Sequence, residues 1–262
     1  MTNREILETA MRQSAVDQNC DAEDYLRSEH KIAESRQNSL ARKYLQLPFD
    51  CDLVSYGNNI VASVSAPCRK LTEEYLNTYP MAHCFETPHL HVLNSALTPL
   101  GLGVCFMAEY FLPDLNRLTI PECPFQIRIL SPSEFKELYL PQWSNALCEK
   151  RKELDSIAAG AYDRKGQLIG LAGASADCET MWQIGVDVLP EYRRCGIAAA
   201  LTGNLAAEIL QKGKVPFYCA AWSNLASVRT ALRCGFRPAW AEVTAKPLEF
   251  IRQMNQPALS QA

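Results

Sequence analysis

The sequence lacks the features that mark several large classes of protein. Its longest apolar run, residues 100–108, is far short of the roughly 20 residues that a membrane-spanning helix needs. It has no excess of one charge, because 26 Lys and Arg stand against 29 Asp and Glu, a net charge of −3. That balance argues against nucleic acid or an anionic membrane as a partner. The start, Met1-Thr2-Asn3-Arg4-Glu5, is not a basic and apolar leader. We therefore expect a cytoplasmic protein with no membrane and no nucleic-acid partner.

Cysteine is abundant, but the spacing of a metal or redox site is missing. The 11 cysteines lie at least 15 positions apart, so the sequence has no Cys-x-x-Cys pair. Neither a zinc ribbon nor a thioredoxin-type site is predicted. Most cysteines have apolar neighbours, which favours small buried thiols in a reducing compartment. The length of 262 residues and the apolar fraction of 48% predict one to two folded domains.

Three of the four histidines, His83, His89 and His91, lie close together around Glu86. On a strand, His89 and His91 would be adjacent ligands, and the cluster would hold a metal. However, Pro88 interrupts the segment and the spacing matches no common zinc pattern. We therefore expect partly buried histidines and no metal.

Charge divides the chain into an acidic and a basic half. Residues 1–123 carry 10 basic and 16 acidic side chains, whereas residues 124–262 carry 16 and 13. The break falls at two prolines, Pro121 and Pro124, which interrupt helices and strands. We predict an α+β N-terminal domain at 1–123 and a second domain at 124–262. The weakly basic second half favours a small anionic ligand over a polymer.

Apolar periodicity predicts the elements of the first half. The predicted helices are 3–16, 22–45, 68–77 and 89–97, the predicted hairpin joins 53–56 to 60–64, and a buried strand covers 104–111.

The second half alternates strands and helices. The predicted strands are 125–130, 157–162, 168–174, 182–189, 217–222 and 239–244. Ser131, Pro132 and Glu134 form a capping-box pattern, followed by a helical stretch through 143–154. Further helices are predicted at 196–211 and 224–234.

The segment from Val186 to Ala198 carries the most chemistry. A predicted strand ends at Val188, and a short loop with Arg193, Arg194 and Gly196 leads into a helix. Free N–H groups and the positive end of the dipole make a helix start a good phosphate site. Gly196 lets the backbone approach a ligand closely. The spacing excludes a dinucleotide fingerprint and a P-loop, so the sequence predicts another kind of phosphate or pyrophosphate site.

Two motifs resemble those of the GNAT superfamily, the acyl-CoA-dependent N-acyltransferases. They are Arg193-x-x-Gly196-x-Ala198 and the later Asn224 with Gly235-Phe236. The predicted order of elements over 125–247 is also similar to that family. The whole chain resembles bacterial proteins of two parts with a GNAT-type second part. The resemblance implies an α/β fold with a central, mixed, splayed sheet flanked by helices.

The resemblance also implies where acetyl-CoA, the expected co-substrate, would bind. The pyrophosphate would lie on the backbone N–H groups of residues 194–198, and the pantetheine arm would pair with Val186 and Val188. A backbone N–H near these valines would polarise the thioester carbonyl. The residues expected to contact CoA are Val186, Val188, Arg193, Arg194, Cys195, Gly196, Ile197, Ala198, Asn224, Ser227 and Arg233. Because Cys195 lies inside the loop, modification of its thiol is expected to interfere with CoA binding.

The sequence departs from the family at one catalytic position. Many members have a tyrosine four residues before the Gly-Phe pair that protonates the leaving thiolate, and here that residue is Ala231. Tyr218, Cys219 and Ser223 lie on nearby segments, and the sequence does not choose among them. A CoA thiolate also leaves with little help, because the pKa of a thiol is about 8.5.

Three acids are candidates for the general base that keeps the attacking amine neutral. Asp177 and Glu179 lie between two predicted strands, at the expected mouth of the splay. Asp187 lies within a strand, where an acid needs a partner. Each has an alternative interpretation: Asp177 and Glu179 as solvated loop acids, and Asp187 as an acid tied to a backbone N–H or an arginine.

The sequence therefore predicts an enzyme that transfers an acetyl or similar group from acetyl-CoA to a primary amine of a small molecule or peptide. The N-terminal half would cover the acceptor side or pair with a second subunit in a homodimer. The alternative is a sensor or scaffold that binds acyl-CoA without turnover, which Ala231 favours.

Overall fold

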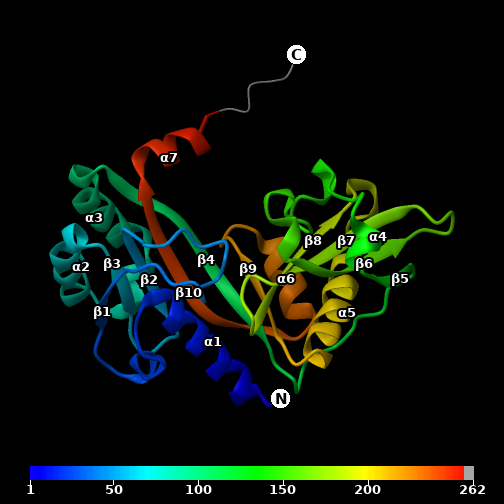
Figure 1. Cartoon of the computed structure of the whole chain (residues 1–262), viewed down its shortest axis with the longest axis horizontal. Coiled ribbons are helices and arrows are strands. Elements are labelled where there is room, and N and C mark those ends of the chain that lie inside the picture. Colours follow the sequence, from blue (N-terminus) through cyan, green and yellow to red (C-terminus); the bar gives the residue numbers. More distant parts are fainter. Residues whose placement is uncertain (257–262) are drawn as a thin grey trace. The chain divides into compact units, whose positions relative to one another are not determined.

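The computed structural model describes residues 1–256, which form an α/β fold of two compact units (Figure 1). Unit 1 comprises residues 1–13, 42–44 and 109–239, and unit 2 comprises residues 14–41, 45–108 and the segment that begins at residue 240. This division differs from a single boundary at 123/124. Strands β4 (Leu102–Pro113) and β10 (Phe236–Pro247) each contribute residues to both units, which no single cut along the sequence reproduces.

Unit 1 contains six neighbouring strands in the order β4-β9-β8-β7-β6-β5. All neighbours are antiparallel except β8 and β9, which run parallel. The strands that follow β4 in the sequence are β5 (Gln126–Leu130), β6 (Asp155–Tyr162), β7 (Leu168–Ser175), β8 (Met181–Val188) and β9 (Val215–Ala220). All five were predicted to within about two residues at each end, because each is a short apolar run with turn residues on either side.

Two helices of unit 1 pack on this sheet, and the first begins directly after the loop that contains Arg193, Arg194 and Gly196. Helix α5 (Ile197–Gln211) buries Leu201, Leu205 and Ile209 in one core with β6, β7 and β8 (Figure 1). This spacing of four residues places the three side chains on one helical face. Helix α6 (Leu225–Arg233) packs beside α5. Both helices confirm the sequence prediction.

The connection from β5 to β6 agrees only in part with the sequence prediction. The capping box of Ser131 and Glu134 is present at α4 (Pro132–Phe135). The expected helix through 143–154 is wrong, because the structure has only the short turns η4 (Pro141–Trp143) and η5 (Glu149–Leu154). Here two aspartates on strands accept backbone N–H groups from this segment, and these bonds replace those of a continuous helix.

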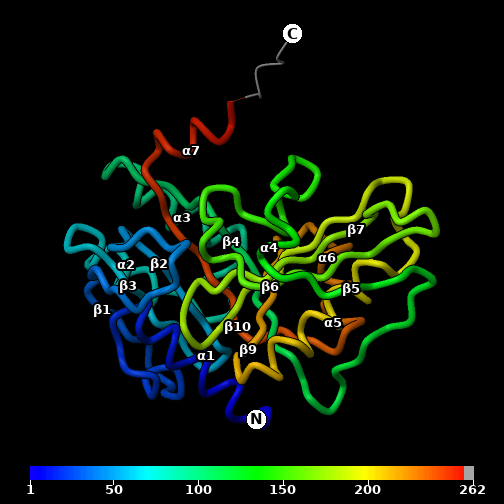
Figure 2. The backbone as a smooth tube through the Cα atoms, turned by 45° about the vertical axis from the view of Figure 1, so that its right-hand side comes forward, coloured from blue at the N-terminus to red at the C-terminus, as the bar shows by residue number. Residues whose placement is uncertain are grey.

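Unit 2 contains four neighbouring strands in the order β1-β3-β2-β10. The predicted hairpin is confirmed as β2 (Cys51–Ser55) and β3 (Val61–Val64), which are antiparallel. Helices α2 (Ala66–Thr78) and α3 (Thr87–Leu97) bury Tyr75, Leu76 and Leu93 in one core with these strands. Figure 2 traces α2 and α3 near β2 and β3 in the second view. Helix α1 (Asn3–Gln18), also predicted, supplies residues to both units.

The predicted helix at 22–45 is wrong. The structure has a short turn η1 (Ala22–Leu26), the strand β1 (Lys31–Glu34) and a long loop. The fully buried Asn59 donates to the carbonyls of Asp24 and Glu29, and His30 Nδ1 accepts the N–H of Ile60 at 3.0 Å. These long-range bonds fix a non-helical backbone, so local periodicity misleads here.

Two further short elements complete unit 2. These are η2 (Met81–Phe85) and η3 (Thr98–Leu100). The C-terminal helix α7 (Leu248–Met254) was not predicted. Among the described residues, no helix has the length and apolarity to span a bilayer.

Candidate active site

The two parallel strands β8 and β9 pair only at their beginnings. The paired residues are Met181 with Val215, Trp182 with Pro216 and Gln183 with Phe217. Beyond Gln183, β8 continues to Val188 with β7 still paired along its other edge. The β9-facing edge of residues 184–188 therefore has backbone groups to offer to an extended ligand, since a strand edge binds chain-like molecules through its N–H and C=O groups.

The loop that follows β8 brings a left-handed turn to a helix start. A short turn η6 (Pro190–Tyr192) leads to Arg194 with φ 66° and Gly196 with φ 81°, and α5 begins one residue later. Positive φ at a residue other than glycine is uncommon and strained. The turn presents the N-terminus of α5, whose first N–H groups have no partner within the helix. This geometry suits a bound phosphate.

Arginines surround this helix start. Arg193 Nε donates to the carbonyl of Val188 at 3.1 Å, which ties the loop to the end of β8. The guanidinium of Arg233, at the end of α6, lies 3.8 Å from where a Cβ on Gly196 would be. Arg194 and Cys195 are exposed. The structure thus brings most of the expected CoA-contacting residues to one place, and their charge is positive.

The second motif begins α6. The side chain of Asn224 accepts the N–H of Ser227 at 3.2 Å and caps the helix. The Ser227 hydroxyl lies 2.7 Å from the hydroxyl of Tyr218 on β9. Tyr218 is the first residue of β9 beyond the paired part, so this hydroxyl pair lies beside the point where β8 and β9 part.

Burial controls the protonation of Tyr218. Its ring is 3% exposed and packs edge-on against Phe236. Burial raises the pKa of Tyr218 to about 12, although the hydrogen bond with Ser227 acts in the opposite direction. The phenol is therefore a hydrogen-bond donor at neutral pH. Ala231, at the position of the family's tyrosine, is fully buried. Sequence reasoning named Tyr218 as one candidate acid and Ser227 as a CoA contact, but it did not predict the hydrogen bond between them.

Asp187 anchors the loop before η5. Its carboxylate accepts the N–H groups of Asn145 and Ala146 at 2.8 and 2.9 Å and the Asn145 side-chain amide at 2.6 Å. The loop lies directly on two strand glycines: a Cβ on Gly185 would overlap the carbonyl of Asn145, and one on Gly173 that of Ala146. This is the alternative interpretation of Asp187, as an acid tied to backbone N–H groups. The glycines were the available signal, since glycine within a strand marks a close backbone approach.

The other two acids lie at the paired end of β8. Both precede Met181, which pairs with Val215, so they are not at the end where the strands part. Asp177 is fully buried and forms an ion pair with Arg151. Burial raises the pKa of Asp177, while Arg151 partly offsets that effect. Glu179 is exposed.

We predict that Asp187→Ala lowers the free energy of unfolding by about 2 kcal/mol, because three hydrogen bonds to one carboxylate are lost from a partly buried site. Urea unfolding measures this change, and amide hydrogen exchange is expected to accelerate at Asn145 and Ala146. The matched control is Glu179→Ala, which removes an exposed acid and is expected to change stability by less than about 0.5 kcal/mol. Equal stability of the two variants would contradict the anchoring role.

Taken together, the open strand edge and the arginine-lined helix start have a geometry that suits an extended ligand bearing a phosphate. Residues 120–236 match the model of the acetyltransferase (GNAT) family. These residues therefore form a GNAT acetyltransferase domain, as their motifs predicted.

The chain is also similar to several solved structures. An N-acetyltransferase-like protein from Streptococcus suis is 21% identical, over 59% of this chain and 69% of that chain, with a TM-score of 0.43. An N-acetyltransferase from Kribbella flavida is 16% identical over 58% and 62%, with a TM-score of 0.46. An aminoglycoside antibiotic 6'-N-acetyltransferase from Acinetobacter baumannii is 23% identical over 44% and 92%, with a TM-score of 0.34. The chain spans about two thirds of the length of the first two. No curated protein sequence matched.

Proposed function

We propose that the protein transfers an acetyl or similar acyl group from acyl-CoA to a primary amine of a small molecule or peptide by direct attack. The observation that carries this proposal is the parting of β8 and β9 after Gln183 and Phe217, on the strand that leads into the helix start at Gly196. The family match of residues 120–236 supports it.

Each part of CoA has a counterpart in this arrangement. The pyrophosphate binds the N–H groups of residues 194–198, with Arg193 and Arg233 supplying positive charge. The pantetheine arm lies along the free edge of β8, against the backbone of Val186 and Val188. Asn224 and Ser227, at the start of α6, border the thiol end.

The reaction forms a C–N bond and breaks the C–S bond of the thioester. A backbone N–H of residues 186–188 stabilises the oxyanion that develops on the carbonyl. The leaving sulfur accepts a hydrogen bond from the Tyr218–Ser227 hydroxyl pair, which takes the place of the family's tyrosine. The amine loses its proton to solvent water, since Asp177 and Glu179 lie at the paired end of β8 and the carboxylate of Asp187 is held by Asn145 and Ala146. Asp177 and Asp187 have structural roles: Asp177 pairs with Arg151, and Asp187 anchors the loop at Asn145 and Ala146.

A second function is favoured by one observation. Ala231 is buried and inert at the position of the family's acid, which suits a domain that binds acyl-CoA as a sensor or scaffold without turnover.

Isothermal titration with acetyl-CoA, followed by turnover with a library of primary amines, separates the two functions. Free CoA is detected by chromatography, because the protein's 11 thiols obscure a thiol reagent. Binding with turnover supports the transferase. Binding without turnover supports the sensor, and no binding overturns both.

We predict that Gly196→Ala weakens acetyl-CoA binding about tenfold. A left-handed alanine is strained by about 1 kcal/mol or more, so the loop relaxes away from its ligand-binding shape. Titration calorimetry measures the change. Gly213→Ala is the matched control: its φ of 72° is similar, but it lies past the far end of α5. Its added Cβ meets no atom within 4 Å, and that on Gly196 makes only ordinary contacts at 3.7–3.8 Å, so neither variant introduces a clash. An equal loss of affinity in both variants would refute the role of the loop.

A further inference from the structure

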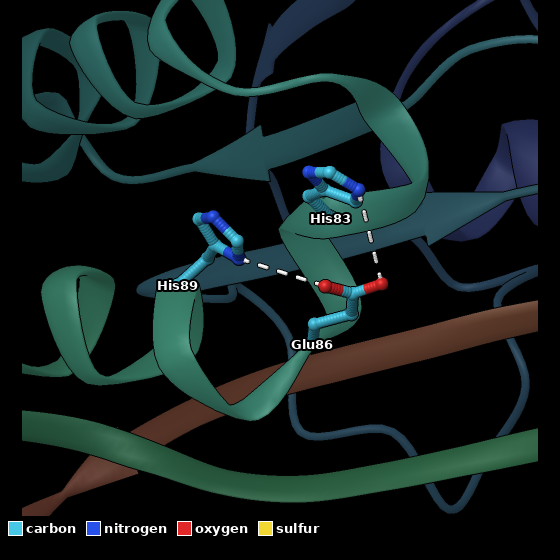
Figure 3. Close-up of side chains that lie close together, drawn as sticks. All are labelled: His83, Glu86 and His89. Atoms are coloured by element: carbon cyan, nitrogen blue, oxygen red, sulfur yellow. Dashed lines mark ion pairs between the residues drawn. The ribbon is translucent and has the colours of Figure 1, made fainter.

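Three side chains of unit 2 converge from the junction of η2 and α3. His83 Nε2 lies 4.0 Å from Glu86 Oε1, and His89 Nδ1 lies 3.9 Å from Glu86 Oε2 (Figure 3). One ligand-type atom from each of the three residues lies within 4.8 Å of the others. The glutamate thus stands between two imidazoles. His91 is not part of this group, and the segment is helical, so the strand pairing of His89 with His91 does not occur.

The backbone that carries these side chains is held in place. The N–H of Glu86 donates to the carbonyl of His83 at 2.9 Å, and the N–H of His89 donates to the carbonyl of Glu86 at 3.1 Å. The core holds this turn in place, because Cys84 is fully buried and its carbonyl accepts a hydrogen bond from the hydroxyl of Tyr75 at 2.9 Å. The three positions therefore keep their spacing without a ligand.

The aromatic surroundings leave one nitrogen without a hydrogen bond. The His89 ring packs edge-on against Tyr79 at 4.5 Å and stacks with His83 at 5.2 Å between centroids. His89 Nδ1 is buried and has no hydrogen-bond partner among the described residues, and it points toward the glutamate carboxylate (Figure 3). A buried polar atom without a hydrogen bond is unfavourable, and a metal ion at this point would satisfy it.

We propose that His83, Glu86 and His89 bind a divalent transition metal ion, of which Zn²⁺ fits best. Two imidazoles and one carboxylate are a known ligand set for zinc, with a fourth position left to water. Zinc bonds of about 2.0–2.2 Å place tetrahedral ligand atoms about 3.4 Å apart, so atoms that now lie up to 4.8 Å apart must approach by as much as about 1.4 Å. His83 and Glu86 are about half exposed, so small side-chain rotations close the site.

The position of the site defines its effect. Its ligands come from the end of η2 and the first turn of α3, so a bound ion joins the two elements and stabilises unit 2. The carboxylate offsets the positive end of α3, which would otherwise repel a cation. None of the three residues belongs to unit 1, which carries the loop at Gly196, so this inference is independent of the proposed acyl transfer.

Titration of the full, chelator-treated protein with Co²⁺ tests the proposal. We expect one equivalent to bind with visible d–d bands and without a thiolate charge-transfer band, which excludes the 11 cysteines as ligands. His83→Gln, Glu86→Gln and His89→Gln should each weaken binding at least tenfold. His91→Gln, an exposed histidine on the same helix, is the matched control and should bind like the parent.

A second measurement covers variants that fold poorly. Saturating Zn²⁺ should raise the melting temperature of the parent and of His91→Gln but not of the three ligand variants, whose far-ultraviolet circular dichroism reports their folding. The proposal is overturned if Co²⁺ does not saturate, if a thiolate band appears, or if binding survives in the His83→Gln, His89→Gln double variant.

Discussion

Tyr218→Phe is expected to lower kcat for acyl transfer about 10- to 100-fold, because a hydrogen bond to a charged group contributes about 1.5–3 kcal/mol. The interaction exists only when the sulfur carries charge, so KM for acetyl-CoA should change by no more than about twofold. The 2.7 Å bond between the hydroxyls of Tyr218 and Ser227 makes the pair one unit. Ser227→Ala should therefore cause a similar loss, and the double variant should be little worse than either single one. Steady-state kinetics measures all three.

The pH dependence gives an independent check. Burial raises the pKa of Tyr218 to about 12, so the phenol stays protonated and the pair produces no alkaline fall in kcat below about pH 10. The raised folded-state pKa also means that stability from this group is present below about pH 10 and is lost as the pH rises toward about 12. Tyr162→Phe is the control, because it removes a tyrosine hydroxyl from another strand. Tyr162 lies at the end of β6, with the guanidinium of Arg128 4.7 Å from its ring centroid. Equal kcat in the parent and Tyr218→Phe would exclude the hydroxyl pair from the reaction.

The sequence was sufficient to predict those elements whose structure follows from a local pattern of residues. The strands β5 to β8 are apolar runs bounded by turn residues, and α5 repeats its apolar positions with the period of a helix. The loop from Arg193 to Ala198 was recognisable because a phosphate-binding helix start requires specific residue types at adjacent positions. Residues 120–236 match the family that this motif resembled.

The remaining features depend on contacts between residues far apart in the sequence. Asn59 holds residues 24–30 out of a helix across about 30 positions, which no periodicity reveals. Asp187 reaches back more than 40 positions to Asn145. In both cases a polar side chain, fully buried for Asn59 and partly buried for Asp187, satisfies backbone groups and overrides local preference. The same reason explains why the role of Asp177 was ambiguous, because the sequence does not reveal that its carboxylate faces Arg151.

Arg151→Met is expected to lower the free energy of unfolding at pH 7 by about 3–5 kcal/mol, since it leaves the buried carboxylate of Asp177 without its main partner. Burial already raises the pKa of Asp177, and Arg151 is the largest opposing effect. In the variant the folded state favours the protonated acid still more, so the deficit relative to the parent should shrink as the pH falls from 7 toward 5. Urea unfolding at several pH values measures this deficit.

Lys150→Met, which removes the same charge from an exposed neighbour, should show almost no loss of stability. Adding Asp177→Asn to Arg151→Met should restore part of the stability and reduce its pH dependence, because the buried side chain at position 177 is then neutral, while the buried Asp155 and Arg42 remain. Lack of rescue would instead make the packing of Arg151 over Tyr44, not the ion pair, the source of its contribution.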